Sequence, residues 1–166
     1  RKPYVNLDNA ASTPTNLPVW RTVCRTWRQP GEVRGEIVEH VKEICLEFLG
    51  ASQDKYEIIF TSNTTESINL AAENLQNSPG NDTEPVFIST LMEHNSNDLP
   101  WRNLKGYSMI KLDIDDEGFL DLNELEKLLI QYNQQHLYGN KRIRFMTVSG
   151  CSNVLGVFNN IEEISS

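Results

Sequence analysis

The sequence has little of what marks a membrane, secreted or nucleic-acid-binding protein. No apolar run approaches the roughly 20 residues that a membrane-spanning helix needs. Cys24, Cys45 and Cys151 are an odd number at wide spacing, which fits neither a disulfide framework nor a zinc site. Lys and Arg number 15 against 23 Asp and Glu, and the net charge of −8 argues against nucleic acid or an anionic membrane as a partner. We expect a reduced, cytoplasmic protein without a metal site.

The composition is that of a single folded domain. The 166 residues are 39% hydrophobic and 23% charged, which is typical of a globular chain. This length is sufficient to bury a hydrophobic core.

Apolar residues recur at two different spacings along the chain. Helical spacing occurs over residues 17–28, 33–49, 68–75 and 122–132. Short apolar runs of strand type occur over residues 57–61, 85–89, 107–112 and 143–148. Strands that alternate with helices predict an α/β fold, in which helices cover both faces of a mainly parallel sheet. Ligands of such sheets bind beyond the carboxyl ends of the strands, and three polar clusters of this sequence lie there.

The first polar cluster, residues 61–67, is rich in hydroxyl groups. Hydroxyl residues between a strand and a helix cap backbone N–H groups. They also bind phosphate, because a helix N-terminus offers N–H donors and a partial positive charge. Taken alone, these residues favour the cap. The absence of a G-x-x-x-x-G-K pattern excludes an ordinary nucleotide P-loop.

The other two clusters follow the second and fourth predicted strands. His94 can stack on a planar cofactor or transfer protons, although a hydrogen-bonded turn histidine is the commoner case. Residues 149–156 contain small side chains that permit a close backbone approach to a ligand, and Asn153 can donate a hydrogen bond to it; the alternative is a plain turn. Cys151 has no identifiable base beside it, and we expect it to be a small buried residue.

One further motif resembles the calcium loop of an EF-hand but is better explained otherwise. Residues 113–124 nearly fit the pattern, yet Glu117 departs from it and a strand, not a helix, is predicted before it. A turn over residues 115–118 followed by a capping box from Asp121 to Glu124 accounts for the same residues. We expect no calcium site here.

Taken together, the clusters resemble the class V aminotransferase family, which includes cysteine desulfurases and selenocysteine lyases. The matching segments, in the family's order, are LDNAASTP (7–14), FTSNTTESINL (60–70), EHNSNDLPWR (93–102) and SNVLG (152–156). The resemblance implies part of the large, cofactor-binding domain of a fold type I enzyme, similar to that of aspartate aminotransferase. It also implies pyridoxal 5′-phosphate as the cofactor, an amino acid as the substrate and a homodimer as the assembly.

The resemblance assigns roles by position. Thr64 and Thr65 match residues that bind the cofactor phosphate, and His94 matches the catalytic histidine that stacks on the pyridine ring. Asn153 matches the asparagine that reaches the ring hydroxyl. Asn9, Ala10 and Ala11 match a segment near the substrate pocket.

Some features of the family are not found within these 166 residues. The aspartate that pairs with the pyridinium nitrogen, the lysine that forms the Schiff base and the small C-terminal domain would all follow Ser166. Residues 1–166 therefore correspond to a partial large domain, with 1–20 as an N-terminal segment. A basic, glycine-containing loop of many members is shortened or missing near residues 28–36.

Three functions remain open at this point. The LPWR (99–102) and SNVLG segments are similar to the branch that cleaves C–S or C–Se bonds. Aminotransferases and epimerases share these motifs. The missing lysine leaves a non-catalytic pseudoenzyme or interaction domain as the third alternative, and we expect the 166-residue chain alone to be inactive.

Overall fold

The computed structural model describes residues 14–77 and 83–165. The chain forms two compact units, one that ends at Phe60 and one that begins at Thr61. No helix in the described parts of the chain is both long enough and apolar enough to cross a membrane.

The first unit contains two helices, in agreement with the predicted helical periodicity. Helix α1 spans Leu17–Trp27, with a proline in its first turn, where the missing N–H group has no intrahelical role. Helix α2 spans Gly31–Phe48 and is followed by Gly50 at φ 64°, a left-handed conformation that ends helices and favours glycine.

The strand predicted over residues 57–61 is wrong. The segment is irregular, and Ile59 and Phe60 expose 66% and 54% of their surfaces. A strand exists only when a neighbouring backbone accepts and donates its hydrogen bonds. None of the described strands pairs with this segment, so its apolar β-type sequence is not sufficient.

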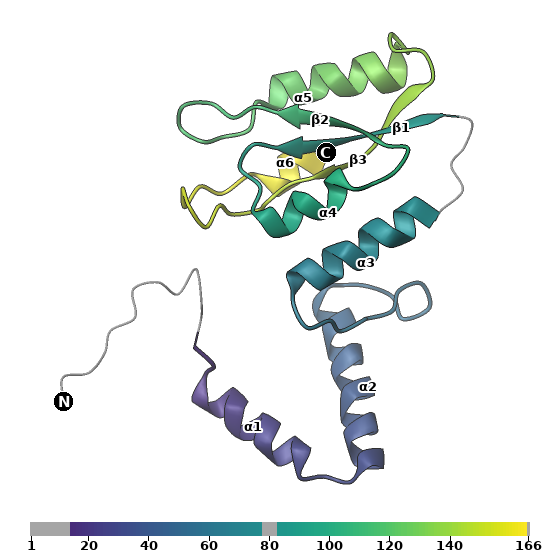
Figure 1. Ribbon diagram of the computed structural model, residues 1–166. Helices are drawn as coiled ribbons and strands as arrows, with labels where there is room; N and C mark the ends of the chain where they lie inside the picture. Colours follow the sequence, from purple (N-terminus) through teal and green to yellow (C-terminus); the bar gives the residue numbers. More distant parts are fainter. Residues whose placement is uncertain (1–13, 78–82, 166) are drawn as a thin grey trace, which may run out of the picture. The chain divides into compact units, whose positions relative to one another are not determined.

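The second unit is built around a three-stranded parallel sheet (Figure 1). The strands are β1 (Glu84–Thr90), β2 (Ser108–Leu112) and β3 (Lys141–Thr147), in the order β2-β1-β3. The helices are α3 (Thr64–Asn77), α4 (Leu99–Arg102), α5 (Leu122–Leu129) and α6 (Ile161–Ser165). A short 3-10 helix covers Asn95–Asn97, and α5 continues into a π-helical turn over Ile130–Gln134.

Helices cover both faces of the sheet, as predicted. Val86 and Ile88 of β1 pack with Leu125 of α5 on one face. Phe87 points to the opposite face, where it packs with Ala72 of α3 and Trp101 of α4. This alternation follows from the two-residue period of a strand. Because β1 is covered on both faces, its sequence is almost continuously apolar, as is usual for a central parallel strand.

A β-bulge in β3 turns Phe145 toward the face of the sheet that α3 and α4 cover. The register between β1 and β3 shifts after the pair Val86–Ile143, so that Phe87 lies opposite Phe145. An extra residue in one strand reverses the face of the side chains that follow it. The rings of Phe87 and Phe145 stack with centroids 5.3 Å apart.

The segment with the calcium-like pattern has the predicted strand, turn and cap. Asp115 accepts hydrogen bonds from two backbone N–H groups of its turn. Asp121 accepts from the N–H groups of Asn123 and Glu124 at 3.0 and 3.1 Å and so caps α5. Only this half of the capping box forms, because the Glu124 side chain pairs with Lys127 instead. The absence of calcium binding remains a prediction.

Candidate functional site

His94 lies just beyond the carboxyl end of β1 and begins the short 3-10 helix. Its Nδ1 atom accepts a hydrogen bond from the backbone N–H of Ser96 at 3.1 Å. A nitrogen that accepts cannot carry a proton, so this geometry selects the neutral imidazole with its proton on Nε2. The Nε2–H group is therefore the hydrogen-bond donor that His94 can offer to a ligand.

The N-terminus of α3 is capped by residues other than the two threonines of the motif. The Asn63 side chain accepts from the Glu66 N–H at 2.9 Å. The Glu66 carboxylate in turn accepts from the hydroxyl and the N–H of Ser62, and these hydrogen bonds, led by the hydroxyl, lower its pKa. No described residue accepts from the N–H groups of Thr64 or Thr65. Donors of this kind at a helix N-terminus suit an anion.

Ser96 links the start of α3 to His94. The Thr65 hydroxyl donates to Ser96 Oγ at 2.8 Å, while the Ser96 backbone N–H donates to His94. Thr65 and Ser96 are 31 positions apart in the sequence. The fold therefore brings two of the predicted site residues together through a third residue that the sequence did not single out.

Asn153 and His94 share a pocket at the strand ends. The pocket has a volume of about 380 Å³ and is lined by residues 91–95, 114 and 152–155. The Asn153 turn is held by Ser152, whose buried hydroxyl accepts from the N–H groups of Val154 and Leu155 at 3.3 and 3.1 Å. The turn interpretation of this segment is thus correct, and the turn also forms a wall of the pocket. Thr64 and Thr65 do not line it.

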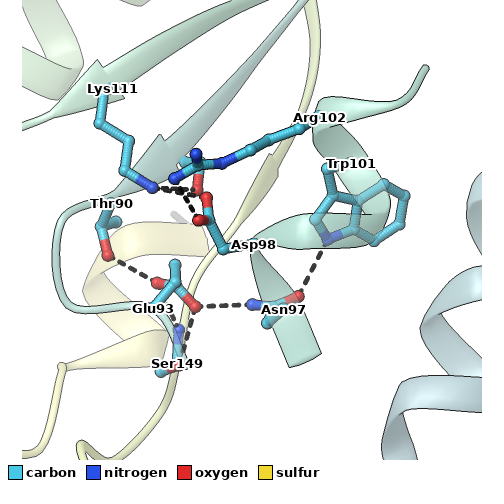
Figure 2. A network of polar contacts seen from close by, with 9 residues as sticks. Thr90, Glu93, Asn97, Asp98, Trp101, Arg102, Lys111 and Ser149 are labelled. Atoms are coloured by element: carbon cyan, nitrogen blue, oxygen red, sulfur yellow. Dashed lines mark hydrogen bonds and ion pairs between the residues drawn. The ribbon is translucent and has the colours of Figure 1, made fainter. Parts of the chain in front are cut away.

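Glu93 is the residue that sequence reasoning missed. Its carboxylate joins the end of β1, the short 3-10 helix and the segment after β3 (Figure 2). It accepts from the Thr90 hydroxyl at 2.6 Å, the Asn97 amide at 2.6 Å, and the Ser149 N–H and hydroxyl at 3.0 and 2.7 Å. The only sequence signal was an acidic side chain three residues after a buried strand.

Asp98 holds α4 against β2 through two ion pairs. Its carboxylate lies 2.7 Å from Lys111 Nζ and 2.5 Å from an Arg102 guanidinium nitrogen, and the residue is only 6% exposed (Figure 2). Burial raises the pKa of Asp98, but the hydrogen bonds and charges of Arg102 and Lys111 outweigh burial, so the pKa lies below its ordinary value. Lys111 also donates to Ser89 Oγ at 3.3 Å.

Three other expectations have different outcomes. Cys151 is exposed, so the prediction that it is buried is wrong; it lies in the loop after β3, where its backbone bridges to Phe158. Asn9, Ala10 and Ala11 lie outside the described residues. Within residues 14–77 and 83–165 no group of three or more potential metal ligands is found.

Comparison with known proteins identifies the family. The model of the family described as aminotransferase class-V matches residues 5–166, nearly the whole chain. The chain belongs to the class V aminotransferase family. The four ordered motifs and their resemblance to this family are thereby confirmed.

Named relatives are cysteine desulfurases that are much longer than this chain. The chain is 30% identical over 174 residues to a probable cysteine desulfurase of Methanothermobacter thermautotrophicus. The matched region is 97% of this chain and 40% of that protein. It is 35% identical over 129 residues to a probable cysteine desulfurase of Pyrococcus abyssi, and the matched region is 76% of this chain and 28% of that protein. The 166 residues thus span less than half of these relatives.

Solved structures confirm the fold. The cysteine desulfurase CsdA from Escherichia coli superposes with a TM-score of 0.71 at 22% identity, over 95% of this chain and 40% of that chain. A NifS-like protein from Rickettsia africae gives 0.70 at 25% identity, over 95% and 42%. Kynurenine aminotransferase from Pyrococcus horikoshii, solved in complex with PMP, gives 0.53 at 16% identity, over 96% and 46%.

Proposed function

We propose that the protein containing this chain is a pyridoxal-phosphate enzyme that acts on an amino acid, with cleavage of a carbon–sulfur or carbon–selenium bond as its reaction. The observation that carries the proposal is the convergence of His94, Asn153 and the start of α3 at one end of the sheet. Family membership and relatives named as cysteine desulfurases support the reaction class.

The residues present suit the cofactor at both of its ends. The N–H groups of Thr64 and Thr65, with no acceptor among the described residues, would bind the phosphate with the aid of the helix dipole. His94 would stack on the ring as a neutral imidazole, and Asn153 would reach the ring hydroxyl. Pyridoxal phosphate, when bound, supplies an electron sink for reactions at the carbons of an amino acid.

His94 is the proposed catalytic residue of this part of the site. The Ser96 N–H fixes the ring and leaves the proton on Nε2, so Nε2–H is the group through which His94 would donate to the cofactor or the substrate. Asn9, Ala10 and Ala11 remain the proposed wall of the substrate pocket. A homodimer remains the proposed assembly.

A non-catalytic role is the second candidate, and it applies if no lysine of the protein containing this chain reaches the site. None of the described lysines lines the pocket of His94 and Asn153, whereas chemistry on an amino acid through this cofactor needs a lysine beside it. An aminotransferase or epimerase of the same family is a third candidate, because Thr64, Thr65, His94 and Asn153 would bind the cofactor in any of these enzymes and would not select the reaction.

The deciding experiment uses purified full-length protein. We expect it to bind added pyridoxal phosphate with an absorbance band of a protein-bound imine, and borohydride to fix the cofactor covalently on one lysine. Cysteine and selenocysteine should then yield alanine, while other amino acids should not. A protein that stays colourless and unlabelled would support the non-catalytic candidate, and turnover of other amino acids without alanine formation from cysteine would support the third.

A further inference from the structure

Four hydrogen-bond donors surround the Glu93 carboxylate, and not every side chain of this size could accept from all of them. The Thr90 and Ser149 hydroxyls can rotate and exchange donor for acceptor roles. The Ser149 N–H, which donates to Oε1 at 3.0 Å, cannot. The Asn97 amide, which donates to Oε2 at 2.6 Å, could in principle turn over and present its oxygen instead.

Trp101 prevents this reversal of Asn97. The indole N–H of Trp101 donates to Asn97 Oδ1 at 3.0 Å, and an indole nitrogen is a donor only. Trp101 is buried in the core between the sheet and helices α3 and α4, so its ring has a fixed place. Asn97 must therefore keep its oxygen toward Trp101 and its NH₂ group toward Glu93.

Both oxygens of residue 93 consequently face a donor that cannot be reversed. A glutamine has the shape of Glu93 but presents one NH₂ group, which would meet either the Ser149 N–H or the Asn97 NH₂. Both donors are half-buried, and a donor that faces another donor there loses its hydrogen bond and part of its hydration. Position 93 thus requires an oxygen that accepts at both places, which a carboxylate supplies and an amide does not.

We propose that Glu93 is the positioning residue of the cofactor site, which holds the loop of His94 against the segment that leads to Asn153. Thr90 at the end of β1 is fully buried, and it anchors one side of the carboxylate to the sheet. Ser149 anchors the other side after β3, and His94 directly follows Glu93 in the chain. The relative placement of His94 and Asn153 therefore passes through this carboxylate. This inference rests on the proposed function for its link to pyridoxal phosphate.

The test is an exchange of charge between positions 93 and 97 in the full-length protein. Glu93→Gln creates the donor conflict, and Asn97→Asp places two carboxylates at hydrogen-bond distance, which disfavours ionisation of both. In the double variant the glutamine at position 93 can donate to the carboxylate at position 97, and that carboxylate can also accept from Trp101, so every donor has an acceptor again. The net charge of the double variant equals that of the wild type.

We expect each single variant to raise the Kd for pyridoxal phosphate about tenfold or more, since about 1.4 kcal/mol corresponds to a factor of ten. The double variant should bind within about threefold of the wild type. The absorbance and circular dichroism of the bound cofactor, and the imidazole NMR signals of His94 in the cofactor-free protein, should shift in the singles and return in the double. Glu124→Gln, at an exposed glutamate that pairs with Lys127 on α5, is the matched control and should change neither.

Two results would overturn the inference. One is a Glu93→Gln protein with unchanged affinity and unchanged His94 signals. The other is a double variant that recovers the melting temperature but not the cofactor spectrum or the His94 signals, because Glu93 would then stabilise the fold without placing the site. If Glu93→Gln does not fold, native His94 signals in the double variant support the inference, and a double variant without them contradicts it. A wild-type protein that binds no pyridoxal phosphate would refute the proposed function, and the His94 signals would still decide the role of Glu93.

Discussion

At the scale of single residues, neighbouring side chains at the start of α3 have different tasks. Asn63 and Glu66 satisfy backbone groups of the cap. The Thr65 hydroxyl instead reaches across to Ser96. The hydroxyl takes no part in the cap, so its loss should leave the helix intact. If the hydroxyl turns from Ser96 to a bound phosphate, its loss should weaken that ligand instead.

Replacement of Thr65 by Ala should weaken binding of pyridoxal phosphate by about 1.5–3 kcal/mol, the usual contribution of a hydrogen bond to a charged group. Pyridoxal without its phosphate should lose much less affinity. Titrations of the full-length protein with both ligands measure the difference. Thr22→Ala, which removes a hydroxyl that bonds within α1, is the control for the substitution itself. Equal losses for both ligands would mean that Thr65 does not contact the phosphate.

Asp98 gives the molecule a defined sensitivity to acid. Its pKa in the folded protein lies below the ordinary value of about 3.9. The unfolded chain therefore takes up this proton first as the pH falls. The stabilisation from the carboxylate is complete above the unfolded pKa and is lost as the pH drops through the folded pKa.

Asp98→Asn should lower the free energy of unfolding by about 1–3 kcal/mol at pH 7, because Lys111 and Arg102 lose a charged acceptor. Urea denaturation at pH 7 and at pH 3 should show this deficit shrink in acid, because the unfolded wild type then takes up a proton at Asp98 and the carboxylate stabilises the fold less. Asp116→Asn, at an exposed turn residue, should have little effect at either pH. A deficit that is the same at both pH values would argue against a lowered Asp98 pKa.

At the scale of elements, local signals predicted helices better than they predicted strands. The apolar spacing and caps of α1, α2 and α5 are properties of each segment, and all three helices form. Residues 57–61 have the composition of a strand, but a strand also requires a partner that is distant in the sequence. The π-helical turn after α5 could not be predicted either, since Asn133 stabilises it by pairing with both backbone groups of Ile143 in β3.

The cap of α5 offers a quantitative test of the half-formed capping box. Asp121→Ala removes the acceptor of two backbone N–H groups and should destabilise the protein by about 1 kcal/mol. Glu124→Ala removes only an exposed pair with Lys127 and should cost about 0.3–0.5 kcal/mol. Thermal or urea unfolding of the two variants measures the contrast. Equal losses would mean that Glu124 takes part in the cap after all.

At the scale of the whole molecule, the sequence predicted which segments meet but not what holds them together. The resemblance assigned Thr65, His94 and Asn153 to one site, and the fold brings their segments to the same end of the sheet. Glu93 escaped notice because its role depends on Ser149, 56 positions away. A carboxylate can be recognised as the centre of a hydrogen-bond network only when its donors are known, and the donors to Glu93 come from three segments.

The chain of 166 residues alone should not form an imine with pyridoxal phosphate or turn over an amino acid. Imine formation needs a deprotonated amine next to the cofactor aldehyde. Lys111 is paired with Asp98, and Lys127 is paired with Glu124. The hydrogen bond that Lys127 donates to Glu124 raises the Lys127 pKa, so this amine keeps its proton. The remaining described lysines are outside the lining of the pocket; they are Lys42, Lys55, Lys105 and Lys141.

The start of α3 is the proposed phosphate site and lies within this chain, so weak noncovalent binding is compatible with the same argument. Among the described strands β3 pairs only with β1, and Val154 and Phe158 beyond it are 83% and 72% exposed. An open strand edge beside apolar side chains favours association, so the isolated chain should sediment as oligomers or aggregates.

Borohydride reduction with pyridoxal phosphate, followed by mass spectrometry, tests the chemistry directly. A stoichiometric adduct on one native lysine would move the catalytic centre into these 166 residues, whereas scattered, substoichiometric labelling is the expected result.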